Sequence, residues 1–148
     1  WVDSSAAALE ALQANAATNG LKAQVIRGDG FDVLESLHAE GRRFDVVVID
    51  PPAFIKRKKD VAKGEAAYKR LNQLAMQILE RDGFLVSCSC SWHLEPDALL
   101  NAIQRAARHL DRFAQIVEVG GQGPDHPLHP AIPETRYLKA FFVRVSNA

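Results

Sequence analysis

Apolar and polar positions along the chain predict strands and helices in turn. The strongest signal is the run from Phe44 to Ile49, which is apolar except for Asp45 and typical of a central parallel strand buried on both faces. Pro51 and Pro52 follow, and because neither has an amide hydrogen to donate, the strand must end at Asp50. We therefore expect the Asp50 carboxylate at the carboxyl edge of the sheet, where open α/β sheets bind ligands.

The remaining patterns alternate around this run. Helices are expected at residues 4–17, 31–40, 66–80 and 95–110, and strands at residues 2–3, 23–27, 84–88, 113–119 and 137–145. Turn residues are expected at 82–83, and a loop rich in Gly and Pro covers residues 120–133. The alternation predicts an α/β fold with a mostly parallel sheet, helices on both faces and a C-terminal antiparallel hairpin.

Two more acids are predicted at the same sheet edge. Asp3 ends the first strand just before Ser4 or Ser5 caps a helix, a position that accepts hydrogen bonds from ribose hydroxyls in dinucleotide-type folds. Asp29 lies in a glycine turn after the second strand and would approach a bound adenine. Each has an alternative structural interpretation, since Asp3 also fits a helix cap and Asp29 a solvated turn.

Composition narrows the class of protein. The 148 residues suit one domain, 1–148, and the 18 basic and 18 acidic side chains cancel, so contact with nucleic acid must come from local patches. No apolar run reaches membrane-spanning length, no secretory signal is visible, and the two cysteines suit a reduced, cytoplasmic protein. Because the chain opens at Trp1 with a strand already ending, we expect a fragment whose beginning lies upstream.

A basic run follows the Asp50 turn. Lys56, Arg57, Lys58 and Lys59 lie together in residues 55–63. Like charges in a run are often solvated and mobile, but a loop at this edge of the sheet could also bind phosphates.

Cys88 and Cys90 lie in a serine-rich segment, residues 87–91, at the end of the fourth strand. A cysteine at a strand end near a cleft can act as a nucleophile, whereas one inside a strand behaves as a small apolar group. The spacing to the histidines at 93, 126 and 129 fits no recognised zinc site, so no metal is expected.

Several motifs together point to one family. In chain order they are Asp50-Pro51-Pro52-Ala53-Phe54, Tyr68-Lys69 with Asn72, Ser89-Cys90-Ser91, Asp125-His126-Pro127 and Tyr137-Leu138-Lys139. Over nearly its whole length the chain resembles the S-adenosylmethionine-dependent cytosine-5 methyltransferases that act on large-subunit ribosomal RNA and usually carry an N-terminal PUA domain. The resemblance implies a Rossmann-like class I methyltransferase domain, S-adenosyl-L-methionine as methyl donor, ribosomal RNA as partner and a cysteine that attacks the base.

The resemblance also implies roles for individual residues. Counting from Gly83, Cys90 rather than Cys88 takes the nucleophile position, and Asp50 would hold the exocyclic amine or a ring nitrogen of the base. The base that removes the carbon-5 proton is not identified. Cofactor contacts are expected from Asp3, Asp29, Asp50 and Pro51, and substrate contacts from Pro52, Phe54, Lys56 and Arg57, with Phe54 stacked on a flipped base.

The chain departs from the family pattern at its N-terminal side. The first strand, expected between the strands that end in Asp3 and Asp50, is missing with its Gly-rich loop and the PUA domain. Upstream residues of the same protein or a partner would complete the sheet, and a homodimer is left open. Two other functions also remain open: methylation of an exocyclic base nitrogen, which needs no cysteine, and a non-catalytic RNA-binding fragment.

Overall fold

The computed structural model describes residues 1–147. They form two compact units, the first Trp1–Arg42 and the second from Arg43 onward. Within the described residues, no helix is both long and apolar enough to pass through a bilayer.

The first unit contains one short parallel pair of strands. β1 (Val2–Asp3) pairs with β2 (Ile26–Arg27), with Val2 opposite Ile26. The strand predicted over residues 23–27 is thus formed only at its last two residues. β1 belongs to a different sheet from the strand that ends before Asp50, and the strand expected between them stays a prediction.

The helices of the first unit begin and end as their capping residues predict. α1 (Ala6–Thr18) follows Ser5, whose hydroxyl accepts a hydrogen bond from the amide of Ala8 over 3.2 Å. Gly20 then takes a φ of 69°, a left-handed backbone that only glycine adopts cheaply. The second helix is α2 (Gly30–Ala39).

The second unit is built on a four-stranded mixed sheet. Its strands are β3 (Phe44–Ile49), β4 (Leu79–Ser89), β5 (Arg112–Gly120) and β6 (Lys139–Asn147), in the order β3-β4-β6-β5. β3 and β4 are parallel, whereas β6 runs antiparallel to both β4 and β5. The predicted C-terminal antiparallel hairpin is confirmed, and its second strand lies next to β4.

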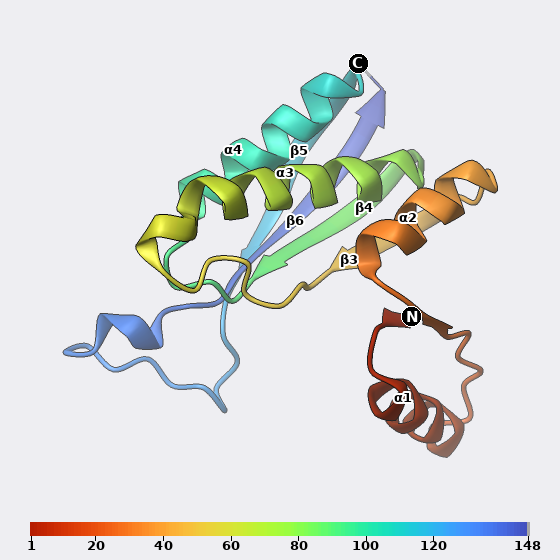
Figure 1. Cartoon of the computed structure of the whole chain (residues 1–148), viewed down its shortest axis with the longest axis horizontal. Helices are drawn as coiled ribbons and strands as arrows, with labels where there is room; N and C mark the ends of the chain where they lie inside the picture. Colours follow the sequence, from red (N-terminus) through yellow and green to blue (C-terminus); the bar gives the residue numbers. More distant parts are fainter. Residues whose placement is uncertain (148) are drawn as a thin grey trace. The chain divides into compact units, whose positions relative to one another are not determined.

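Two helices cover one face of this sheet. α3 (Val61–Gln77), preceded by the 3₁₀ turn η1 (Lys58–Asp60), and α4 (Pro96–His109) lie side by side against the strands (Figure 1). A second 3₁₀ turn, η2 (Pro133–Thr135), interrupts the loop before β6. The core between helices and sheet includes Leu71, Leu85, Leu99, Ile103, Phe141 and Val143, each at most 5% exposed.

β3 is buried on one face only, which corrects the prediction of burial on both. Val47 and Ile49 are 9% and 7% exposed, but Val46 and Val48 are 56% and 62% exposed. Successive side chains of a strand point to opposite faces, and the helices of this unit cover only the face that Val47 and Ile49 share.

The boundary between α3 and β4 also differs from the prediction of a helix over 66–80. The helix ends at Gln77, and Leu79 already pairs with Phe44 of β3. The apolar pair at 78–79 continues the helical spacing, but pairing with the sheet takes precedence over that local pattern. Gly83 lies inside β4 rather than in a turn, and a Cβ there would come within 3.0 Å of the Asp45 carbonyl oxygen.

The register of β4 against β3 jumps at this point, since Phe44 pairs with Leu79 and Val46 with Phe84. The guanidinium of Arg112, at the start of β5, donates hydrogen bonds to the carbonyl oxygens of Glu80 and Arg81 in the irregular stretch, over 2.8 and 3.1 Å. A long side chain from a distant strand therefore satisfies backbone groups that the ladder leaves unpaired.

Ile55, in the loop after β3, packs against the glycine of α3. Ile55 is 2% exposed, and a Cβ added at Gly64 would overlap Cγ1 of Ile55 and lie 2.9 Å from its Cδ1. The helix therefore needs a residue without a side chain at this position, because the loop that follows Asp50 is seated there.

We expect Gly64→Ala to lower the free energy of unfolding by about 1–3 kcal/mol, because the new methyl group must displace the buried Ile55 side chain. Denaturant unfolding measures the loss. Gly30→Ala is the matched control, since no atom lies within 4 Å of the place that its methyl group would take, and a small gain is expected. Equal stability of Gly64→Ala and the wild type would contradict this account of the loop.

Candidate active site

The tips of two neighbouring strands bring Asp50 and Cys90 to one edge of the sheet. Asp50 directly follows β3 and Cys90 directly follows β4, and the two strands are parallel, with Ile49 opposite Ser87. Sγ of Cys90 lies 4.0 Å from the carbonyl oxygen of Pro51. The thiol therefore faces the turn that begins at Asp50, instead of pointing into the apolar core.

The two cysteines lie in different surroundings. Cys88 is a half-buried residue of β4, paired with Ala140 of β6. Burial, reinforced by the negative charge of Asp50, raises the pKa of the Cys88 thiol to about 11. Cys88 is therefore protonated at neutral pH and is a poor nucleophile. Cys90 lies just beyond the strand and is also half-buried.

A buried network of hydroxyl groups holds the residues on either side of Cys90. The Ser89 hydroxyl donates to the Tyr68 hydroxyl over 2.8 Å, and the Tyr68 and Ser91 hydroxyl oxygens are 3.0 Å apart. The amide of Ser91 also donates to Oγ of Ser89 over 3.1 Å. All three side chains are 0% exposed, so the backbone that carries Cys90 is fixed from inside the molecule.

Ser91 connects this network to two other segments. Its hydroxyl accepts a hydrogen bond from the amide of Ile55 over 3.3 Å, which joins it to the loop after Asp50. Its carbonyl oxygen accepts from Nζ of Lys139, at the start of β6, over 2.8 Å. Burial lowers the pKa of the Lys139 ammonium, while the charges of Glu95 and Cys90 act in the opposite direction.

The residues predicted to bind substrate lie along the loop after β3. Phe54 is half-buried, with its ring centroid 4.9 Å from that of Tyr68 and a tilt of 55°. Pro52 and Lys56 are exposed. Arg57 is exposed too, but its Nε donates to the Asp60 carboxylate over 3.1 Å, so a phosphate would compete with that ion pair.

The predicted cofactor carboxylates of the first unit lie at one end of its strand pair. Oδ1 of Asp3 accepts from the amide of Ser5 over 2.7 Å, and Oδ1 of Asp29 accepts from the amide of Phe31 over 2.8 Å. Asp3 thus binds the amide of Ser5, the N-cap residue of α1, in line with its interpretation as a cap. Asp29 is the N-cap of α2, where the alternative prediction was a solvated turn. The amide of Gly28 donates to the Asp3 carbonyl over 3.1 Å, which joins the two strand ends. In the described residues the Oδ2 atoms accept no hydrogen bond, so both carboxylates can still accept from ribose hydroxyls or an amine.

The sequence analysis named Tyr68, Ser89, Ser91 and Lys139 only as members of family motifs and assigned them no role in the site. One usable signal was present. In β6 the inward positions alternate as Lys139, Phe141 and Val143, so the lysine occupies a position that the pattern reserves for buried side chains.

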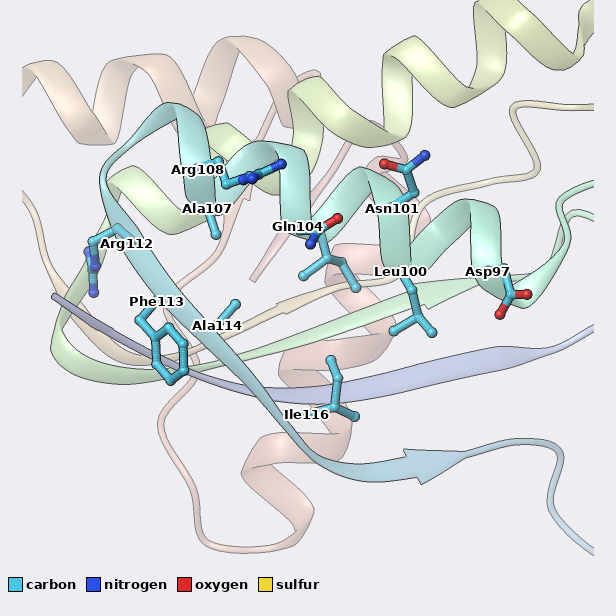
Figure 2. A pocket seen from close by; sticks show the side chains of 11 residues that line it. Asp97, Leu100, Asn101, Gln104, Ala107, Arg108, Arg112, Phe113, Ala114 and Ile116 are labelled. Atoms are coloured by element: carbon cyan, nitrogen blue, oxygen red, sulfur yellow. The ribbon is translucent and has the colours of Figure 1, made fainter. Parts of the chain in front are cut away.

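One groove lies away from these residues. Between α4 and β5 runs a groove of about 570 Å³, where Leu100 and Ile116 point toward each other (Figure 2). None of the predicted site residues lines it. Among residues 1–147, no three His, Cys, Asp or Glu side chains gather closely enough to hold a metal ion.

Comparison with known proteins identifies the family. Residues 1–116 match the model of the methyltransferase small domain. The chain belongs to this family. Ribosomal RNA large subunit methyltransferase I of Serratia proteamaculans is 37% identical over 147 residues, and that of Aeromonas salmonicida 40% over 146. Each match covers 97% of this chain but only 37% of the relative.

Solved structures of methyltransferases share the fold. SMU.776, described as a methyltransferase and solved with SAH, has a TM-score of 0.80 at 19% identity, covering 97% of this chain and 38% of that one. NSun6 from Pyrococcus horikoshii, solved with SFG, has a TM-score of 0.63 at 15% identity, covering 97% and 39%. The predicted class I methyltransferase fold is thereby confirmed.

We expect Cys88 of this methyltransferase domain to ionise only near pH 11 when Cys90→Ser leaves it as the sole cysteine. Ultraviolet thiolate absorbance follows the titration. Adding Asp50→Asn should move it toward lower pH, but not back to the ordinary value of 9.0, because burial is the larger cause. The unfolded protein is the control, and titration near pH 9.0 in the folded protein would contradict the assignment.

Proposed function

We propose that this protein transfers a methyl group from S-adenosyl-L-methionine to carbon 5 of a cytosine in large-subunit ribosomal RNA, through a covalent adduct with Cys90. The observation that carries the proposal is the placement of Cys90, whose thiol faces the Asp50 turn while Ser89 and Ser91 anchor its backbone. The methyltransferase family and relatives named ribosomal RNA large subunit methyltransferase I support it.

S-adenosyl-L-methionine supplies an electrophilic methyl group when bound. We assign its ribose hydroxyls to Asp3 and its adenine to Asp29, since each carboxylate keeps an oxygen that can accept hydrogen bonds. Asp50 and Pro51 would contact it at the edge of the second unit. The acceptor oxygens of Asp3 and Asp29 support this assignment.

Cys90 solves the central chemical difficulty, because carbon 5 of cytosine is a poor nucleophile. The Cys90 thiolate forms a bond from sulfur to carbon 6, and the electron pair of the double bond between carbons 5 and 6 moves to carbon 5. Once carbon 5 carries the methyl group, a base removes its proton. The electron pair of that carbon–hydrogen bond restores the double bond between carbons 5 and 6 and expels the thiolate of Cys90.

The neighbours of Cys90 would bind and activate the base. The Asp50 carboxylate accepts from the exocyclic amine or a protonated ring nitrogen as charge develops on the ring. A base stacked in RNA cannot be reached, so it must be flipped out, and Pro52 and Phe54 offer apolar surface for it. Lys56, and Arg57 once released from Asp60, would contact phosphates.

The second candidate function is methylation of an exocyclic base nitrogen. The Asp50 carboxylate is exposed and is followed by two prolines and an aromatic residue, an arrangement suited to accepting hydrogen bonds from an amine. Methylation of that amine requires no cysteine. The third is RNA binding without catalysis, through the basic run at 56–59.

The whole protein would be larger and would act in the cytoplasm. The chain spans 37% of the length of its curated relatives, and we propose that an upstream strand, its Gly-rich loop and a PUA domain complete it. A second copy of the chain is a further candidate partner.

We expect Cys90→Ala in the full-length protein to abolish formation of 5-methylcytosine, on the order of a thousandfold or more, because no adduct can form. Mass spectrometry of nucleosides from ribosomal RNA measures the product. Cys88→Ala is the matched control and should keep the activity, since Cys88 is protonated and lies within β4.

Product retained by Cys90→Ala would rule out covalent catalysis. A methyl group on an exocyclic nitrogen would favour the second function. RNA binding that weakens steeply with salt, with no methylated product, would favour the third.

We expect ribosomal RNA containing 5-fluorocytosine to remain attached to the wild-type protein. The adduct forms as before, but fluorine at carbon 5 cannot leave as a proton, so the double bond is not restored and Cys90 is not released. Denaturing gel electrophoresis and peptide mapping detect the complex. Attachment through Cys88, or an equally stable complex with Cys90→Ala, would contradict the assignment.

A further inference from the structure

Lys139 is a buried cation at the candidate site. It is 8% exposed and shares the inward face of β6 with Phe141 and Val143. Removing an ammonium from water is costly unless its hydrogens find acceptors. Nζ donates to the carbonyl oxygens of Ser91 and Tyr137, each over 2.8 Å. An apolar side chain could fill this position without that cost, so the buried ammonium of Lys139 indicates a role beyond packing.

The register of the sheet places this cation against the backbone around Cys90. Lys139 pairs with Ser89 in the antiparallel ladder of β4 and β6, and its ammonium binds the carbonyl of Ser91. The residues before and after Cys90 are thus both neighbours of Lys139. An ammonium has three hydrogens, and within the described residues two of those of Lys139 have acceptors.

We propose that Lys139 is a positioning residue for Cys90: its ammonium holds the Cys90–Ser91 backbone in place, and its positive charge favours the thiolate form of Cys90. The inference rests on the proposed function and deepens it, because that function needs the thiolate. The proton released from Cys90 passes to solvent, and Lys139 itself forms no covalent bond.

The charges around the site are consistent with this role. Cys90 raises the pKa of Lys139 against the lowering effect of burial, which indicates that the two side chains lie close enough for their charges to interact. Glu95 also acts on Lys139 and reduces the net positive charge there. The charge of Asp50 acts on Cys88, and the Tyr68 hydroxyl is bonded to Ser89 and Ser91. Lys139 is a cation that the structure places at this strand tip.

The test measures the reactivity of Cys90 without RNA or cofactor. In the full-length protein with Cys88→Ser, the rate of Cys90 alkylation by iodoacetamide is followed as a function of pH. Lys139→Gln keeps a hydrogen-bond donor but loses the charge, Lys139→Met loses both, and Lys139→Arg keeps the charge. Lys22→Met, which removes an exposed lysine of the first unit, is the matched control.

We expect Lys139→Gln and Lys139→Met to slow alkylation at neutral pH roughly tenfold and to shift the pH profile upward, because an adjacent positive charge is lost. Lys139→Arg should restore most of the rate, and Lys22→Met should change nothing. Circular dichroism checks the fold of each variant. If Lys139→Met does not fold, the comparison of Lys139→Gln with Lys139→Arg decides the test.

Equal alkylation profiles for wild type, Lys139→Gln and Lys139→Arg would overturn the proposal, and Lys139 would then be a structural residue only. The proposed function fails on a different result, the absence of 5-methylcytosine from RNA treated with the wild-type protein. The two failures are therefore separate.

Discussion

The buried hydrogen bonds among Tyr68, Ser89 and Ser91 are the interaction on which the site depends. They link the middle of α3 to the tip of β4, and their three side chains are completely buried. Buried hydroxyls are costly when unpaired and strongly directional when paired. The network therefore determines where β4 ends and how its next residue, Cys90, is presented.

Ser91 extends that constraint to the rest of the second unit. Through its hydroxyl it holds Ile55, and with it the loop that carries the Asp50 turn. Through its carbonyl it holds Lys139 and the start of β6. Gly64 completes the arrangement, because its missing side chain leaves room for Ile55 on α3. The loop, the strand tip and the cation are thus parts of one packed structure.

The two cysteines lie two residues apart in the chain but have different surroundings. Cys88 lies within the ladder, where burial and the nearby Asp50 keep its thiol protonated. Cys90 lies beyond the last ladder pair of β4, facing the carbonyl of Pro51. If the strand extended by one residue, Cys90 would itself become part of the sheet.

The sequence alone determined much of this protein. Capping residues and periodicity were sufficient for the helices of the first unit, and the prolines after Asp50 for the end of β3, because these depend on local backbone preferences. The motifs around Asp50 and Cys90 also indicated a methyltransferase. Only the tertiary structure decided which face of β3 is buried, that α3 stops at Gln77, and that Lys139 and Arg112 bind carbonyl groups of distant segments. Such features depend on contacts between residues far apart in the chain, which no local pattern encodes.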